Sequence, residues 1–220
     1  MIELAFDTAT AACTVALRRD DGELFEITPP PARLTERPAH TTELLPAILE
    51  VAARAGVALG DVDRLAVGIG PGAFTGLRIG VATARAIATA NEIGLTPISS
   101  LSALGSDDVT PVIDARRNEF FFRIAGDDRL AGPERAVAEI SMGGLPAVGD
   151  GAIKLREELT AHGALVAPDD DPIHLVSAAT MLDLARRITP LAPDEIVPNY
   201  IRPPDAKVSS RESWLVGAAK

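Results

Sequence analysis

The sequence is poor in the features that mark secreted or membrane-spanning proteins. It has a single cysteine, Cys13, which excludes an intrachain disulfide and fits a reducing compartment. No apolar run approaches the length of about 20 residues needed to cross a bilayer. The N-terminus leads straight into an expected strand, without the pattern of a signal peptide. We therefore expect a soluble, cytoplasmic protein.

Positive charge is scarce as well. The 21 lysines and arginines are outnumbered by 31 acidic residues, which gives a net charge of −10. Before the C-terminal residue, lysine occurs only at Lys154 and Lys207. Because phosphate contacts need clustered lysine and arginine, the chain is not expected to hold nucleic acid by itself. Its hydrophobic content of 47% is ordinary for a globular protein and excludes disorder for most of the chain.

The first half of the chain predicts an α/β layout. A meander of three strands is followed by two helix–strand units, which indicates a mixed sheet. Thr41 or Thr42 is expected to cap the first helix. The expected strands cover residues 2–6, 13–18, 23–28, 64–69 and 95–99. One expected helix covers residues 43–55, and a second, long helix is opened by the run 70–80 and reaches about Ile93.

A second, similar beginning follows at Val109. The run Leu4–Asp7 reads as a strand that ends in an aspartate, and the run 110–114 repeats this pattern and ends in Asp114. Each is followed by a polar turn and a further strand, which suggests an internal duplication. We expect two lobes, 1–105 and 106–220, with the second abbreviated to a glycine-rich stretch and helices at about 152–161 and 177–188. The last dozen residues, which include Trp214, are expected to be mobile.

The most specific stretch is the run GPGAFTGLRIG at 70–80, which joins a strand to a long helix. Its glycines permit a tight turn that aims backbone N–H groups outward, which suits an anion. Along the helix, small residues recur every four positions and line one face: Gly76, Gly80, Ala84 and Ala88. Such a face allows close approach of another element, so it predicts either a docking surface or tight internal packing.

Together with IELAFDTATAACTVAL, HTTELLP, Ser99-Ser100-Leu101 and VIDARRNEFFF, this run resembles the TsaB family, in order and spacing. TsaB is the dimerisation subunit of the bacterial tRNA threonylcarbamoyladenosine synthase, and the resemblance is strong over about residues 1–125. It implies the duplicated, ribonuclease H-like fold of the actin/hexokinase/Hsp70 superfamily.

The resemblance also implies partners. TsaB-type proteins pair with the catalytic paralogue TsaD or with a second TsaB, and the ATPase TsaE completes the assembly. The complex transfers threonylcarbamoyl from threonylcarbamoyl-AMP to N6 of the adenosine next to the anticodon in tRNAs that read ANN codons. We expect this chain to be a non-catalytic subunit that meets tRNA only through the complex. The expected partner interface comprises Leu44, Leu45, Ile48, Gly76, Gly80, Ala84, Arg85 and Ala88.

The two strand-end turns are a candidate nucleotide site in degenerate form. In the superfamily, Asp-x-Gly-Thr turns hold phosphate and metal, whereas here neither turn contains glycine. Asp7 and Asp114 would either hold Mg²⁺ together across a cleft or simply cap their turns. The candidate residues are Asp7, Thr8, Thr10 and Asp114, with Gly149 and Gly151 in a worn adenosine loop or a plain turn. We expect no cofactor in the isolated chain, with weak binding of ATP and Mg²⁺ left open.

Other chemistry is poorly supported. His40 lacks the second histidine one helical turn away that a metal site would need, so a packing role and no metal are expected. Cys13 lies in an expected strand, and no Gly-x-Ser-x-Gly elbow is present. No catalytic residue is therefore assigned. The alternative is a small kinase or ATPase, or a nucleotide-gated adaptor, that works between Asp7 and Asp114.

Overall fold

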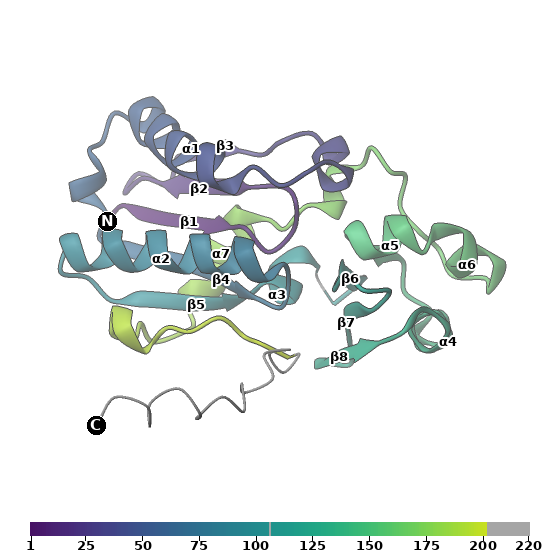
Figure 1. The fold of residues 1–220 in the computed structure, drawn as a ribbon. Helices are drawn as coiled ribbons and strands as arrows, with labels where there is room; N and C mark the ends of the chain where they lie inside the picture. Colours follow the sequence, from purple (N-terminus) through teal and green to yellow (C-terminus); the bar gives the residue numbers. More distant parts are fainter. Residues whose placement is uncertain (106, 202–220) are drawn as a thin grey trace, which may run out of the picture.

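Two β-sheets, one from each half of the sequence, form the framework of the molecule (Figure 1). The computed structural model describes residues 1–105 and 107–201. Trp214 and the last dozen residues lie outside the described part. None of the helices in the described residues is long and apolar enough to cross a membrane.

The first sheet has the strand order β3-β2-β1-β4-β5. Its central strand β1 pairs antiparallel with β2 and parallel with β4, as the predicted meander and helix–strand units require. Helices α1 and α2 pack on one face of this sheet and α7 packs on the other. The elements are β1 (Glu3–Asp7), β2 (Thr14–Arg18), β3 (Leu24–Ile27), α1 (His40–Ala55), β4 (Arg64–Gly70), α2 (Phe74–Ala90), β5 (Leu95–Ser99) and α7 (Ala178–Ala185).

Successive side chains of the first sheet's strands face two different hydrophobic cores, one on each side of the sheet. Leu4 and Phe6 point into the core under α1 and α2, whereas Ala5 points toward α7. The neighbouring strands repeat the pattern, with large residues on the first face and Ala16 and Ala66 on the second. Because successive side chains of a strand face opposite sides, the small residues all meet α7, and the large ones fill the space beneath α1 and α2.

The second sheet has the order β8-β7-β6-β9. Its central strand β6 pairs antiparallel with β7 and parallel with β9, so its topology repeats that of the first sheet. The predicted two-lobed, ribonuclease H-like fold is thereby confirmed. The elements of this half are α3 (Ser100–Leu104), β6 (Thr110–Asp114), β7 (Phe120–Ile124), β8 (Asp127–Ala131), α4 (Pro133–Gly143), β9 (Ala147–Val148), α5 (Asp150–Lys154) and α6 (Arg156–Ala161), and short 3-10 helices occur at 31–35, 59–61, 172–174 and 193–195.

The second lobe contains more strands and helices than the sequence analysis expected. The stretch that was read as glycine-rich contains β8 and α4. Strand β8 follows a two-residue turn in which Ala125 and Gly126 both have positive φ. Helix α4 begins at Pro133, a favoured first helical residue. The predicted helix at 152–161 is divided at Leu155 into α5 and α6.

Helix α7 returns from the second half of the chain to the first sheet. Glu3 of β1 is 1% exposed. Its carboxylate lies 2.8 Å from Arg186, which follows α7, and 3.4 Å from Arg64 of β4. A buried carboxylate needs such cationic partners, because an unpaired charge is costly in the interior. Residues 178–186, which were assigned to the C-terminal lobe, therefore pack with the N-terminal sheet.

The turn after β1 lies directly against the glycine face of α2. The Thr8 hydroxyl donates a 2.8 Å hydrogen bond to the Gly76 carbonyl. A Cβ atom at Gly76 would lie 2.1 Å from the Thr8 carbonyl oxygen, and one at Gly80 would lie 2.4 Å from Thr8 Oγ1. Both glycines are thus required by the contact between this turn and the helix.

This contact predicts a specific sensitivity to added bulk. Gly76→Ala is expected to lower the free energy of unfolding by about 3 kcal/mol, because backbone must move to admit the methyl group. Gly60→Ala is the control, since nothing lies within 4 Å of a Cβ at that position. Urea denaturation of both variants measures the effect, and equal stabilities would contradict the account.

Candidate functional site

The carboxylate of Asp7 is used entirely within the chain. It lies at the end of β1, is buried, and accepts hydrogen bonds from the Ala9 backbone N–H at 2.7 Å and the Ser100 hydroxyl at 2.5 Å. Burial raises the pKa of Asp7, and these two hydrogen bonds lower it in part. A Cβ at Gly68 would lie 1.8 Å from the same carboxylate. Asp7 therefore joins the turn to α3 and β4.

Its neighbours in the candidate nucleotide turn are also internal. Thr8 and Thr10 are both buried. The Thr8 hydroxyl bonds α2, and the Thr10 hydroxyl donates to the Ala12 carbonyl at 3.4 Å. Since the turn lies against the helix at Gly76, its side chains serve the packing of the first lobe.

Asp114, at the end of β6, lies among positive charges. Lys154 Nζ lies 3.1 Å from its carboxylate, and the Arg116 guanidinium lies 3.3 Å away. The Arg116 backbone N–H adds a 2.8 Å hydrogen bond. Asp114 and Asp7 thus each make a turn-type hydrogen bond to the residue two positions on, as the simpler interpretation of both positions expected.

A buried carboxylate that the sequence analysis did not single out, Asp150, lies beside Asp114. Asp150 accepts a 3.0 Å hydrogen bond from the Asp114 backbone N–H. Burial raises the pKa of Asp150 to about 6, and the nearby charge of Asp114 contributes in the same direction. An Asp between two glycines gave no sequence signal for burial, because the same tripeptide is common in exposed turns.

Gly149 and Gly151 flank this carboxylate and permit close packing on β6. Gly149 has a φ of 106°, and a Cβ there would lie 2.2 Å from the Val112 carbonyl oxygen. A Cβ at Gly151 would lie 2.8 Å from the Val112 side chain. The Gly149 N–H donates to Nδ1 of His174, a fully buried histidine that the sequence analysis left without a role.

Six of the eight expected interface residues are internal. A side chain buried in the single chain cannot contact a partner, so the docking role assigned to these residues is wrong. Small residues at four-residue spacing admit any close neighbour, and here the neighbours are the turn at Thr8 and the first sheet. The buried residues are Leu44, Ile48, Gly76, Gly80, Ala84 and Ala88.

The other two expected interface residues, Arg85 and Leu45, are not buried. Arg85 donates to the carbonyl oxygens of Asp194 and Ile196, at 2.7 and 2.6 Å, and so binds the segment that follows α7. Leu45 is 50% exposed, whereas the adjacent Leu44 is buried. Of the eight, Leu45 is the apolar side chain that remains on the surface.

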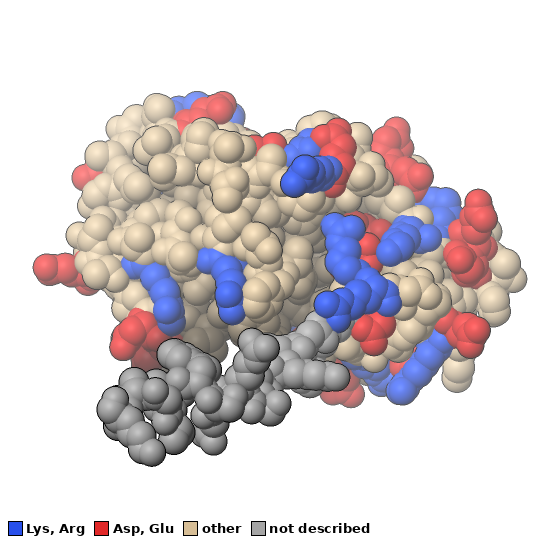
Figure 2. Space-filling model, in the orientation of Figure 1, with Lys and Arg blue, Asp and Glu red and all other residues tan. Residues whose placement is uncertain are grey.

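Leu45 belongs to an exposed apolar surface on α1 and α2. The sequence analysis expected the docking surface on the small-residue face of α2 instead, and that face is buried. Leu49 on α1 and Phe74 on α2 are also 50% exposed, and Ala82 and Ala86 of α2 are exposed as well. We call these five residues the outer face. Figure 2 shows that the surface over α1 and α2 carries few charged side chains. Exposed apolar side chains that group on a surface are characteristic of protein–protein contact sites.

The remaining candidates for chemistry are packing residues. The Cys13 thiol is buried, and burial raises its pKa to about 12, so it stays protonated. His40 is 3% exposed, and its Nε2 lies 2.9 Å from the Thr10 carbonyl oxygen. Burial lowers the pKa of His40, which keeps the ring neutral near pH 7.

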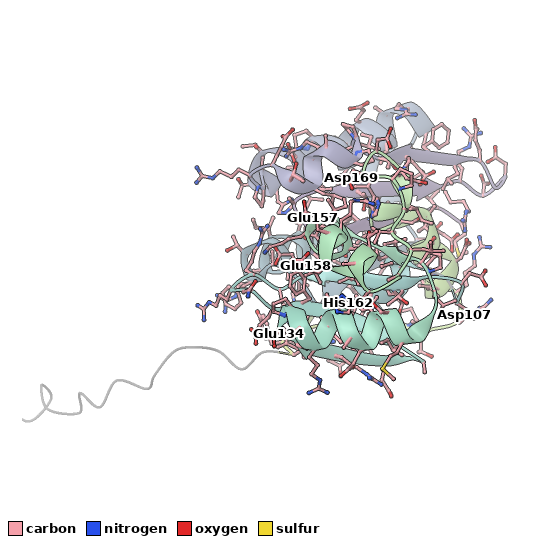
Figure 3. All side chains as sticks on the ribbon, turned by 90° about the vertical axis from the view of Figure 1, so that its right-hand side faces the viewer. Asp107, Glu134, Glu157, Glu158, His162 and Asp169 are labelled. Carbon is pink, nitrogen blue, oxygen red and sulfur yellow. The ribbon has the colours of Figure 1, made fainter. Side chains whose placement is uncertain are left out.

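The outer end of the second lobe is acidic. Glu134 of α4 and Glu157 and Glu158 of α6 lie on this end (Figure 3). The ring of His162 contacts the Glu158 carbonyl oxygen through Nδ1 at 2.8 Å. Within residues 1–105 and 107–201, no group of three His, Cys, Asp or Glu side chains is placed to hold a metal ion.

The pKa of Asp150 predicts a dependence of stability on pH. Its value of about 6 in the folded chain exceeds the ordinary 3.8, so the folded state binds the proton more tightly. Stability from this group is therefore lost as pH rises from about 4 to about 6. Asp150→Asn keeps an oxygen for the Asp114 N–H without charge, and should raise the free energy of unfolding by roughly 2 kcal/mol at pH 7.5.

Denaturation at pH 7.5 and pH 4 measures this effect, and little gain is expected at pH 4. Asp127→Asn, at an exposed position of β8, is the matched control and should change stability at neither pH. A gain of equal size at both pH values, or a loss at pH 7.5, would contradict the proposed cost of the buried charge.

Comparison with known proteins connects this architecture to a family. A sequence model of TsaD, tRNA N6-adenosine threonylcarbamoyltransferase, matches residues 34–143, which is half of the chain. The tRNA threonylcarbamoyladenosine biosynthesis protein TsaB of Haemophilus influenzae is 41% identical over 127 residues, 54% of this chain and 51% of that protein. The chain thus spans about half the length of this curated relative.

Two further similarities cover nearly the whole chain. An uncharacterized protein of Mycobacterium tuberculosis is 36% identical over 211 residues, which is 93% of each chain. A crystal structure from Pseudomonas aeruginosa, described as similar to the peptidase YeaZ, superposes with a TM-score of 0.73 at 28% identity and covers 91% of this chain and 99% of its own. These similarities confirm the family that the motifs indicated: the chain belongs to the TsaB family.

Proposed function

We propose that this protein is a non-catalytic subunit in the biosynthesis of threonylcarbamoyladenosine in tRNA. The names of the curated TsaB relatives support the pathway. Within the complex, TsaD would carry out the threonylcarbamoyl transfer to tRNAs that read ANN codons, and TsaE would supply the ATPase. Both lobe aspartates already bind groups of this chain, which favours a supporting role over one in catalysis.

The observation that carries this proposal is the outer face of α1 and α2. Leu45, Leu49 and Phe74 are each half-exposed, and Ala82 and Ala86 are exposed as well, on the two helices that cover one face of the first sheet. Since the TsaD sequence model also matches this region, a partner with the same fold can offer a similar pair of helices. A TsaD subunit would bind there in the complex, and a second copy of this chain would bind there in its absence.

Substitution of the outer face tests the proposal. The double variant Leu45→Asp/Leu49→Asp should fold normally, because both side chains are already half-exposed. Two carboxylates buried in an apolar contact should weaken binding to TsaD of the same organism at least about a hundredfold, or roughly 3 kcal/mol. Calorimetric titration of the two purified subunits measures the affinity.

Leu165→Asp serves as the control, since Leu165 is 67% exposed on the second lobe. It introduces one such carboxylate away from the outer face and should leave the affinity unchanged. An unchanged affinity in the double variant, or an equal loss in the control, would overturn the docking assignment. ATP added to the isolated chain in the same instrument tests the alternative, because tight binding that Asp7→Ala weakens would favour a nucleotide enzyme or adaptor.

A further inference from the structure

Residues 190–200, which we call the strap, run along the side of α2 that is turned away from α1 (Figure 1). The strap pairs with the edge strand β5 through two backbone hydrogen bonds between Leu95 and Leu191, of 2.9 and 3.0 Å. Farther along, Arg85 of α2 donates to two carbonyl oxygens of the strap, and Ile196 is buried in the core beneath α2. The strap is thus a fixed part of the first lobe.

A groove of about 480 Å³ lies between α2 and the strap. Its apolar lining includes Ala82 of α2 and Val197 and Pro198 of the strap, and Val197 is 63% exposed. Ala82 also belongs to the outer face. The groove therefore continues the outer face across α2, on the side away from α1.

One end of the groove is held in place by three stacked side chains. The rings of Phe74 and Tyr200 have their centroids 5.4 Å apart, and the Arg78 guanidinium lies 3.9 Å from the centroid of the Phe74 ring. Arg78 Nε also donates a 3.2 Å hydrogen bond to the Tyr200 hydroxyl. Because these contacts fix the strap against α2, the groove is already formed in the isolated chain, which favours binding.

The position of α1 makes this surface complementary to itself. Helices α1 and α2 begin level with each other, since His40 and Phe74 line one cavity, and both run from there toward the same side of the molecule (Figure 1). At 1.5 Å per residue, Leu49 lies roughly 13 Å along α1 and Ala82 roughly 12 Å along α2. A two-fold axis parallel to α2 places α1 of one copy over the strap of the other. Leu49 then lies over the groove, and the same contact forms twice.

The charges at these positions are complementary as well. Arg78 and Arg85 line the groove, and no described residue of the lining is acidic. Glu50, which is exposed, lies roughly 15 Å along α1, and Arg85 lies roughly 16 Å along α2, so the same axis brings them level. Arg85 donates to carbonyl oxygens, and neither it nor Glu50 makes an ion pair within residues 1–105 and 107–201.

We propose that this groove receives α1 of a second copy of the chain, with Leu49 against Ala82 and Val197 and with Glu50 beside Arg85. The proposal rests on the proposed function, because the outer face is shared. It adds the strap as the part of the surface that determines how two copies pair. The result is a closed dimer in which each copy places α1 in the groove of the other.

Disulfide cross-linking tests this pairing, because Cys13, the one native cysteine, is buried. Equal amounts of a Leu49→Cys variant and a Val197→Cys variant are mixed and mildly oxidised, and the linked peptides are identified by mass spectrometry. Since a disulfide forms only between neighbouring Cβ atoms, links between positions 49 and 197 should exceed 49–49 links about fivefold or more. Leu165→Cys in place of Val197→Cys is the control. Equally frequent 49–49 links, or no links between copies, would overturn the proposal.

Substitutions with matched controls measure the strength of the contact. Val197→Asp should raise the dissociation constant of the dimer about tenfold, because a carboxylate would be buried in the contact. Leu191→Asp, on the same strap but outside the groove, should leave it unchanged. Glu50→Arg places a like charge beside Arg85 and should also weaken the dimer about tenfold, whereas Glu134→Arg on α4 should not. Sedimentation velocity gives the constants, and an unchanged value in Val197→Asp or Glu50→Arg would contradict the assignment.

Titration with TsaD of the same organism separates this inference from the docking role. If Leu45→Asp/Leu49→Asp weakens TsaD binding while Val197→Asp leaves the dimer unaltered, the docking role stands and pairing through the groove is wrong. If the links between positions 49 and 197 form but TsaD binding is unaltered in the double variant, the pairing stands and the docking role is wrong.

Discussion

The contact between the turn at Thr8 and the glycines of α2 determines much of the first lobe. Thr8 donates to the Gly76 carbonyl, and the two backbones approach so closely that no side chain fits between them. This contact fixes α2 over the central strands and places α1 beside it. It also determines which side chains of α2 face outward. The surface available to a partner is therefore the opposite face of the same helix.

The same contact changes the character of the strand-end turn. In a nucleotide-binding lobe such a turn needs glycine and free space so that backbone N–H groups reach phosphate. Here Asp7 is bound to Ser100 and Ala9, and α2 lies against the following residue. A lobe that keeps the fold while its turn is engaged internally suits a subunit that stabilises a partner.

Much of the fold could be predicted because its signals are local. The strand meander with its two helix–strand units, and the repeated strand–aspartate pattern at Asp7 and Asp114, predicted strands in both lobes. Strand β8 was missed because it is a polar edge strand, with a burial pattern that is mostly partial. Helix α4 did have a signal, since Pro133 follows a glycine and Val137 and Ile140 share one face.

The candidate site was harder to predict for a physical reason. A row of small residues such as Gly76 and Gly80 shows that something approaches closely, but not which element does so. Only the tertiary structure shows that the turn at Thr8 occupies this face, so the docking surface that we propose consists of exposed side chains such as Leu49. The unpaired Nδ1 of His40 is likewise invisible in the sequence, because it depends on which nitrogen faces Thr10.

The central claim is that the outer face of α1 and α2 is where this chain meets its partner. Hydrogen–deuterium exchange of the chain, alone and with TsaD of the same organism, tests it most directly. The account predicts that protection on complex formation is concentrated in residues 40–55 and 74–90, with α4, α6 and α7 unchanged. Protection confined to the second lobe or to α7, with none in α1 and α2, would contradict it.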